Sequence, residues 1–324
     1  MTIAFLPNIP QTPLVPVKAG QVTDAGRRSE VECIDWSCDG EKLFVLTRDG
    51  TVKMYRGLVE ERSWTGSAIT WLEPHPSHPN VFATVSWDGK LRITDLRGGA
   101  SPQEFDLKQA RGWDKFLLVT WSPDGTQLAI LTRADAVHVL QVDTLGGDDF
   151  VSHQPGSEVY SVLFDRQSRL WVALGGTPGK IQILTPNGMT EMVAHAHMTT
   201  TLARAASPNL IVSGGNDALV ALWDTNTLCC IRTFPESLSP VTTLACGGSG
   251  GLVAWGSGGS KDGESVLSIA VVETGVHALS HPLPAPVVRV KWHPSKRLLA
   301  YSLQGPESTV HLLSFSTGSD SLLK

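Results

Sequence analysis

The stretch SGGNDALVALWDTNTLCCIRTF, residues 213–234, contains an acidic turn, an alternating apolar run and a short closing run. Apolar and polar residues that alternate over a short segment indicate a β-strand, because successive side chains of a strand point to opposite faces. Asp217 lies in the turn, and the alternating run that follows ends in the pair Trp223-Asp224. The stretch therefore predicts strands joined by tight turns.

The same pattern recurs along the chain at a spacing of roughly 39 to 47 residues. Each copy has a first strand, a turn, a second strand, a loop that often contains Asp, and a third strand. The first strands include VECIDW (31–36), a weaker copy ITW that ends at Trp71, FLLVTW (116–121), VYSVLF (159–164), VTTLAC (241–246) and VVRVKW (287–292). The seven third strands are TVKMYR, KLRITDL, AVHVLQV, KIQILTP, LVALWDT, SVLSIAV and TVHLLSF.

Seven strand triplets at this period, each followed by a fourth linking strand, predict an all-β fold, the seven-bladed WD40 β-propeller. We expect one domain over residues 1–324. The last triplet ends near Phe315 and only a few polar residues follow it, so we expect no C-terminal fourth strand there. The segment 15–24 is predicted to supply it and close the ring, which removes two open sheet edges. Irregular tails are predicted at 1–14 and 318–324.

Composition narrows the classes of function. The chain of 324 residues has 26 basic and 31 acidic residues, a net charge of −5 and no basic block, so we expect no phosphate-binding surface for nucleic acid. Its apolar runs are too short to cross a membrane. The N-terminus lacks the basic region of a secretory signal. Five cysteines at irregular spacing argue against a disulfide framework.

The stretch from His197 to Phe234 contains the polar residues of a buried hydrogen-bond chain that is typical of WD40 repeats. We expect a structural tetrad in which the Trp223 indole donates to Ser213, Ser213 bonds His197, and His197 bonds Asp217. Buried polar groups need such partners. A Ser-His-Asp set also resembles a catalytic triad, but a serine committed to an indole is not open to substrate.

A candidate partner-binding mouth lies at one end of the ring. The residue before each turn Asp is expected there, as is the residue four before the first-strand aromatic. The first set is Arg48, Trp87, Ala134 and Asn216, and the second is Glu32, Ser67, Leu117, Tyr160 and Val288. Arg48, Trp87 and Tyr160 have the composition of an interaction hot spot. The alternative for Trp87 is a position folded between two blades.

We predict no catalytic, cofactor-binding or metal-binding residue. The pairs His75/His78 and His195/His197 lack other ligands at metal-site spacing. The glycine-rich segments at 247–251 and 256–263 do not lead into a helix with a Lys-Ser/Thr pair, so they do not match a nucleotide-binding loop.

The segment GGNDALVALWDTNTLCCIRTF, together with PVTTLACG from Pro240 and VRVKWHPSKRLLAYS, resembles the family of WD40-repeat subunits of the THO complex (THO complex subunit 3, part of the TREX messenger-RNA export machinery). The likeness covers about residues 190–315; the earlier repeats share only the propeller spacing. The GGSGG turn and the lack of an acidic turn in the last repeat depart from the family pattern.

This resemblance implies a non-enzymatic scaffold subunit in the nucleus, which couples transcription to messenger-RNA packaging and export. Its implied partners are the large helical THO subunits, with RNA contacted only through the complex. An alternative is a WD40 adaptor or peptide reader in another nuclear assembly, such as a chromatin or ubiquitin-ligase complex. An enzyme built on a propeller would need polar groups with shifted acidities converging on the channel.

Overall fold

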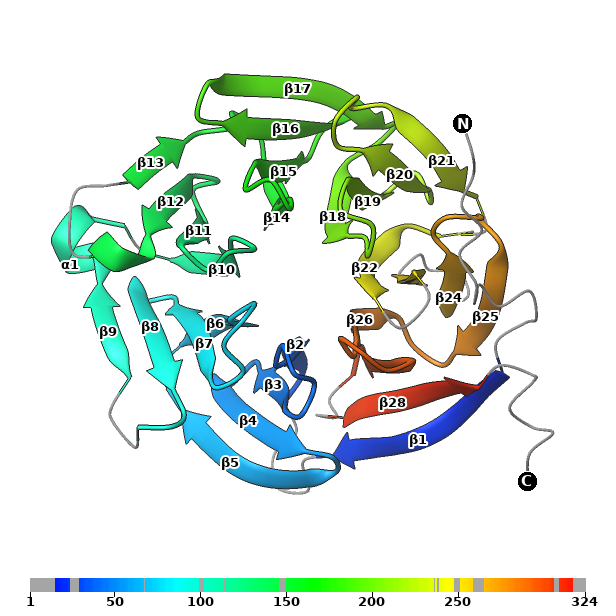
Figure 1. Ribbon diagram of the computed structural model, residues 1–324, viewed down its shortest axis with the longest axis horizontal. Coiled ribbons are helices and arrows are strands. Elements are labelled where there is room, and N and C mark those ends of the chain that lie inside the picture. The colour runs from blue at the N-terminus through cyan, green and yellow to red at the C-terminus, as the bar shows by residue number, and fades with distance from the viewer. Residues whose placement is uncertain are drawn as a thin grey trace.

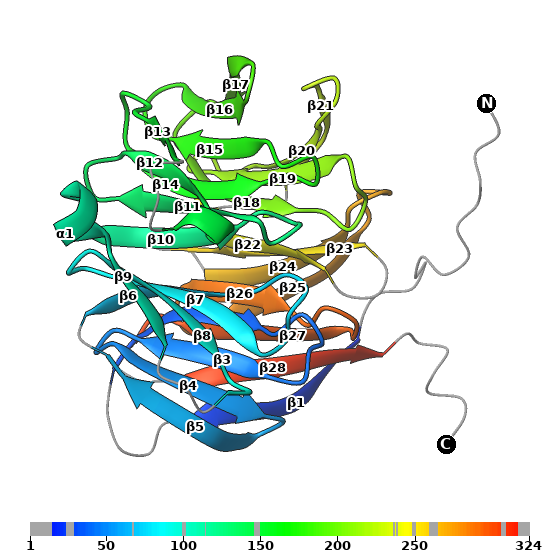
Figure 2. The same cartoon turned by 60° about the vertical axis from the view of Figure 1, so that its left-hand side comes forward.

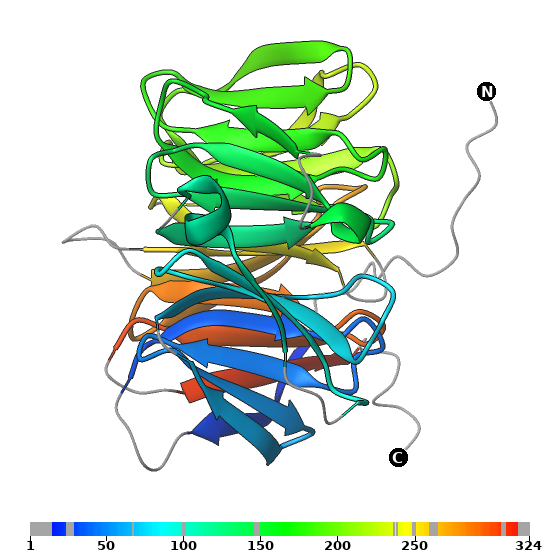
Figure 3. The same cartoon turned by 90° about the vertical axis from the view of Figure 1, so that its left-hand side faces the viewer.

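The computed structural model describes residues 15–23, 29–66, 68–98, 102–113, 115–145, 150–235, 237, 239–247, 251–258, 265–305 and 309–316. These residues form seven four-stranded antiparallel sheets arranged as blades around a central axis (Figure 1). The prediction of an all-β, seven-bladed propeller is confirmed. From the side, the strands run across the thickness of the disc, so the connecting loops emerge on its two faces (Figures 2 and 3).

In blades one to six the strands follow one another in sequence from the centre outward, and in blade seven the N-terminal strand takes the outermost place. The seven blades are, in order, β2 (Val31–Trp36), β3 (Leu43–Thr47), β4 (Thr51–Arg56), β5 (Val59–Thr65); β6 (Ile69–Pro74), β7 (Val81–Ser86), β8 (Lys90–Asp95), β9 (Gln103–Asp106); β10 (Phe116–Trp121), β11 (Gln127–Thr132), β12 (Val137–Gln141), β13 (Phe150–His153); β14 (Val159–Phe164), β15 (Leu170–Leu174), β16 (Gly179–Thr185), β17 (Gly188–His195); β18 (Thr199–Arg204), β19 (Leu210–Gly215), β20 (Val220–Asp224), β21 (Cys230–Phe234); β22 (Val241–Gly247), β23 (Leu252–Ser257), β24 (Ser265–Val271), β25 (His277–Leu283); and β26 (Val287–Trp292), β27 (Leu298–Leu303), β28 (Thr309–Ser316) with β1 (Val15–Thr23). Two short helical segments, α1 (Leu107–Arg111) and η1 (Val142–Thr144), lie in connections.

The ring closes through strand β1, which lies beside β28 although the two are at opposite ends of the chain (Figure 1). Their antiparallel register runs from Val15↔Ser316 to Thr23↔Thr309. The sequence predicts this closing strand over 15–24, and the described strand spans Val15–Thr23. Residue 24 and the predicted tails at 1–14 and 318–324 lie outside the described residues.

Every inner strand has a β-bulge at its second residue, where the register to the next strand shifts. The bulged residues are Glu32, Thr70, Leu117, Tyr160, Thr200, Thr242 and Val288. Three are threonines, and their hydroxyls bond a carbonyl oxygen of the next blade: Thr70 to Phe116 at 2.7 Å, Thr200 to Val241 at 2.6 Å and Thr242 to Val287 at 3.0 Å. The bulge threonines therefore link neighbouring blades near the axis.

The register corrects the alignment of blade two. Trp36 ends β2 opposite Leu43, and the residue that ends β6 opposite Phe82 is Pro74, so Pro74 is the equivalent of Trp36. The weaker copy ending at Trp71 was thus placed three residues too early, because blade two has Pro74 at the position where five of the other first strands have Trp, Phe or Cys. The mouth residue that follows from the corrected register is Thr70. The predicted Ser67 lies outside the described residues.

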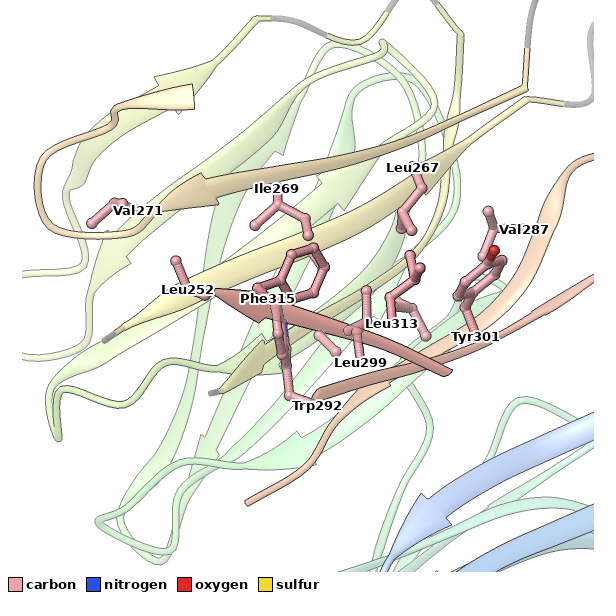
Figure 4. Packing of buried hydrophobic residues seen from close by; sticks show 13 residues of the cluster. Leu252, Leu267, Ile269, Val271, Val287, Trp292, Leu299, Tyr301, Leu313 and Phe315 are labelled. Carbon is pink, nitrogen blue, oxygen red and sulfur yellow. The ribbon is translucent and has the colours of Figure 1, made fainter. Parts of the chain in front are cut away.

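The core lies between the blades as a series of apolar clusters. In the cluster of Figure 4, Leu267 and Ile269 of blade six face Leu299, Leu313 and Phe315 of blade seven, and all five are buried. Burying a side chain of this size contributes roughly 1.5–3 kcal/mol. No blade can bury both of its faces alone, so the stability of each depends on its neighbours.

Two histidines make equivalent contacts between blades. The ring of His75 lies 4.6 Å from the Trp121 ring of the next blade, and that of His293 lies 4.9 Å from Trp36. Each also fills the space beside a turn glycine of the next blade: a Cβ on Gly125 would lie 2.4 Å from the His75 ring. Gly125 also has a φ of +75°, so no other residue fits there without strain.

Blade three contains the histidine whose pKa is most strongly displaced. The His138 ring stacks on Trp113 at 3.7 Å, and its Nδ1 lies 2.7 Å from the Ser152 hydroxyl. Burial, assisted by the Arg111 charge, lowers the pKa of His138 to about 4. Burial also lowers the pKa of His75, His195 and His293.

We expect the propeller to lose stability as the pH falls from 6.5 towards 4. The folded pKa of His138 lies below its unfolded value, so the unfolded chain takes up the proton first and folding is favoured only at higher pH. For His138 alone the loss is about 2 kcal/mol between pH 6.5 and pH 5. Urea unfolding of wild type and His138→Gln at these two pH values measures it. Equal pH dependence in both chains would contradict this origin.

Candidate functional site

The loops between the second and third strands of all seven blades emerge on one face of the ring. Each begins with a residue whose N–H donates to a carbonyl just before the inner strand of the same blade. We call these residues the mouth positions, and they are Arg48, Trp87, Arg133, Gly175, Asn216, Gly258 and Gln304.

The mouth position of blade three is Arg133, and the prediction of Ala134 was wrong. In blades one and two the Asp of the turn precedes a glycine with positive φ, Gly50 or Gly89. In blade three Asp135 itself has the left-handed conformation, with a φ of +57°. The acidic residue is therefore one step later in the turn, and its carboxylate accepts from the Val159 N–H at 2.9 Å. Aligning Thr132 with Thr47, instead of aligning the Asp residues, identifies Arg133 from the sequence.

Arg48 lies at the mouth, and its charge is already paired. Its Nε donates to Glu32 at 2.7 Å, and an Nη forms an ion pair with Glu30. The hydrogen bond to Glu32 is the main reason that the pKa of Arg48 is raised. Although 65% of the Arg48 side chain is exposed, its positive charge is offset by two carboxylates, so blade one offers no net positive charge to a partner.

Trp87 lies on the face of the ring, with 37% of its surface exposed. The guanidinium of Arg133 lies over its ring at 5.3 Å from the centroid. The backbone joins the same blades, since the Lys115 N–H donates to the Trp87 carbonyl at 3.1 Å and the Arg133 N–H to the Lys115 carbonyl at 2.9 Å. Trp87 is thus an exposed aromatic group held by the neighbouring blade.

Tyr160 is the bulged residue of blade four and has 42% of its surface exposed. Its hydroxyl donates to Glu158 at 2.8 Å, and that carboxylate raises the pKa of Tyr160. The ring lies beside Gly175, where a Cβ would approach Tyr160 to 3.0 Å. The structure therefore brings the predicted Arg48, Trp87 and Tyr160 to one face and adds Arg133 and Lys115, which sequence reasoning missed.

The buried tetrad of blade five is formed by His195, Ser213, Asp217 and Trp223, and the choice of His197 was wrong. His195 Nδ1 lies 2.9 Å from Asp217, its Nε2 lies 2.7 Å from the Ser213 hydroxyl, and the Trp223 indole donates to Ser213 at 2.8 Å. His197 is exposed. The two histidines flank Ala196, and strand β17 extends to His195, which places that ring inside.

The tetrad geometry describes a structural set. The Ser213 hydroxyl is fully buried between the imidazole and the indole, so no substrate reaches it. Asp217 also accepts from the Ala196 N–H at 2.8 Å. This hydrogen bond joins the turn between β19 and β20 to the segment that leads into the inner strand β18. Other blades retain pieces of this network, such as the Thr47 hydroxyl that donates to Asp49 at 2.7 Å in blade one.

The inner strands of blades seven, one and two place charged groups around the axis. Lys291 forms an ion pair with Asp35 at 2.8 Å. One Glu73 oxygen accepts from the Thr120 hydroxyl at 3.0 Å and the Trp121 N–H at 3.2 Å, and burial raises the pKa of Glu73. The carboxylate of Glu73 thus accepts from the inner strand of blade three, and Lys291 of blade seven pairs with Asp35 of blade one.

No group of three or more His, Cys, Asp or Glu side chains in the part of the chain that the structure describes is placed to hold a metal ion. Within the same residues, no helix combines the length and the apolar character needed to cross a membrane.

Comparisons with known proteins agree with this architecture. The family model "WD domain, G-beta repeat" matches residues 21–56. THO complex subunit 3 of Arabidopsis thaliana is 25% identical over 290 residues, which cover 86% of this chain and 87% of that protein. WD repeat-containing protein AAC3 of Dictyostelium discoideum is 23% identical and covers 60% of this chain and 39% of its own length.

One solved structure supports the fold. The β-propeller domain of Cps50 (Swd1) from Myceliophteria thermophila superposes with a TM-score of 0.76, covering 93% of this chain and the whole of that domain. Its sequence identity of 15% shows a shared fold alone. The chain is therefore a WD40 β-propeller, and its likeness to the plant protein extends around almost the whole ring.

Proposed function

We propose that this WD40 β-propeller, similar to THO complex subunit 3, is a non-enzymatic scaffold subunit of a THO-like assembly in the nucleus. In this role it couples transcription to messenger-RNA packaging and export through protein–protein contacts. The observation that carries the proposal is the similarity over 86% of this chain and 87% of the plant THO subunit. A likeness confined to one repeat would favour only the fold, because WD40 repeats serve many functions.

The physical character of the ring supports a scaffold. The described part of the chain buries its tetrad serine, pairs Lys291 with Asp35 and presents exposed aromatic and arginine side chains at the mouth. Trp, Tyr and Arg are the residue types that most often dominate protein–protein interfaces. The partners we propose are large helical THO subunits, and RNA is contacted through them.

Affinity purification of the tagged full chain from nuclear extract, followed by mass spectrometry, tests the proposal. Recovery of the large helical THO subunits at high stoichiometry is the expected result. Recovery of histone-modifying or ubiquitin-ligase subunits without THO subunits would replace it with the second candidate, a WD40 adaptor or peptide reader.

The variant Trp87→Ala should weaken capture of the partner subunits at least tenfold, a free-energy loss of about 1.4 kcal/mol or more. Its own stability should change by no more than about 1 kcal/mol, because Trp87 is 37% exposed and belongs to none of the buried core clusters of the described residues. Val193→Ala is the matched control, since Val193 is 60% exposed on the outer strand β17. A fall of Trp87→Ala stability by several kcal/mol would place Trp87 in the core instead.

A further inference from the structure

Two tryptophans of blade two each lie against an arginine from another blade. Arg133 of blade three lies over Trp87 at 5.3 Å, and Arg289 of blade seven lies over Trp71 at 4.9 Å. Trp71 pairs with Val85 in the β6–β7 ladder, and Trp87 follows Ser86, the next residue of β7. Both indoles are therefore at the mouth end of blade two.

The guanidinium of Arg289 is oriented by hydrogen bonds to two backbone carbonyls. Arg289 Nε donates to the Glu32 carbonyl at 2.6 Å and its Nη1 to the Val288 carbonyl at 3.1 Å. Neither acceptor is a carboxylate, so both bonds orient the guanidinium without cancelling its charge. A guanidinium stacked on an aromatic ring keeps its edge donors available for a carboxylate, which it can bind through two parallel hydrogen bonds.

The cations of this region also lack acidic partners. Lys115 and Arg133 are exposed, and no carboxylate of the described residues forms an ion pair with either, or with Arg289. Arg48, on the same face, is enclosed by Glu30 and Glu32. The mouth cations without an acidic partner therefore come from blades three and seven, and two of them lie against the tryptophans of blade two. The mouth arginine of blade one is paired with carboxylates.

We propose that Trp71, Trp87, Lys115, Arg133 and Arg289, which we call the basic-aromatic arc, bind an acidic, extended segment of a partner protein. This inference rests on the proposed function in that it supplies the chemistry by which the scaffold contacts its partner. Carboxylates of the segment pair with Lys115 and the two guanidinium groups, and its apolar side chains pack against the exposed edge of Trp87. Charge complementarity of this kind speeds association and selects the partner.

The acidic peptide is favoured over RNA by the other charges of the mouth. Glu30 and Glu32 lie beside Arg48, and Glu158 lies beside Tyr160 on the same face. A phosphate backbone bound at the arc would run past these carboxylates, whereas a short peptide places its few charges only where the cations are. The whole chain has a net charge of −5, which also opposes a polyanion.

The test uses the full chain and short fluorescein-labelled peptides of alternating Glu and Leu, with a Lys-Leu peptide and a labelled oligouridine for comparison. Fluorescence anisotropy at low and at physiological salt measures each Kd. We expect the Glu-Leu peptide to bind more tightly than either of the others and to weaken as salt is added. Arg133→Met should raise its Kd about tenfold, and Lys115→Met several-fold.

Arg48→Met is the matched control, because it removes a mouth arginine whose charge is already paired; its Kd should stay within about twofold of wild type. A melting curve of each variant ensures that only folded protein is compared. Lys115→Met provides a second test, because this variant leaves both tryptophan–arginine contacts in place. The inference is overturned if neither arc variant weakens the peptide, if Arg48→Met weakens it equally, or if oligouridine binds more tightly at the arc.

The results of the peptide-binding experiment can be distinguished from those of the experiment that tests the proposed function. If THO subunits are recovered from extract but the Glu-Leu peptide does not bind, the arc is not an acidic-segment site and the scaffold role stands. If the peptide binds the arc and no THO subunit is recovered, the arc is an acidic-segment site and the protein belongs to a different assembly.

Discussion

A chain that begins at residue 24 should melt about 10 °C below the full-length protein, because it lacks the strand that closes the ring. Without β1, the backbone of β28 loses its partner from Thr309 to Ser316. Its edge is then open to water and to other chains. β28 also carries Leu313 and Phe315 of the cluster between blades six and seven, so loosening this strand weakens that core. A loss on the order of 5 kcal/mol lowers the melting temperature of a domain of this size by roughly 10 °C.

The control for this deletion is a chain that begins at residue 14, which retains all of β1 and should melt with wild type. A synthetic peptide of residues 13–24, added to the truncated chain, should restore most of the lost stability, whereas a scrambled peptide of the same composition should not. Differential scanning calorimetry measures all five samples, the wild type included. An unchanged melting temperature in the chain that begins at residue 24 would mean that the ring does not depend on its N-terminal strand.

The second large effect is expected from His195→Ala, which should cost about 2–4 kcal/mol of unfolding free energy. Removing the imidazole leaves the Ser213 hydroxyl and the Asp217 carboxylate without their central partner, and the Ser213 hydroxyl remains fully buried. Breaking a buried network in this way costs the desolvation of the groups left behind. Guanidinium unfolding at pH 7 measures the change.

His197→Ala provides a matched comparison two residues away, because His197 is exposed and no hydrogen bond of the tetrad involves it. We expect its unfolding free energy to stay within about 0.5 kcal/mol of wild type. A double-mutant cycle of His195→Ala with Ser213→Ala should show coupling of more than about 1 kcal/mol, as expected for direct partners. Equal costs for the two histidine variants would remove His195 from the network.

The repeat architecture was readable from residues alone because it rests on local rules. Alternation along segments such as LVALWDT specifies a strand, and Asp-Gly specifies the turn beside it. Repetition at a constant spacing then implies blades that must stack, and the missing fourth strand after Phe315 implies closure by the N-terminus. Each of these inferences needs only neighbours in sequence or the number of repeats.

The site required information that sequence order does not carry. His195 and His197 have the same side chain and almost the same position, and only the end of β17 decides which of them turns inward. Arg133 takes the mouth position because Asp135, with its left-handed backbone, is one residue later in its turn than Asp49 or Asp88, so an alignment of the acidic residues misplaces it. Likewise, Pro74 and not Trp71 ends the inner strand of blade two, so Trp71 is free to meet Arg289.

The sequence by itself thus determined the kind of fold, the number of blades and the strand that closes them, because strand periodicity and turn chemistry are local. Only the tertiary structure decided which histidine is buried, which loop residues share the mouth, and which arginines keep an uncancelled charge. Those properties depend on contacts between blades, and a contact between Trp71 and Arg289 joins residues that are distant in the chain and adjacent only when the ring is closed.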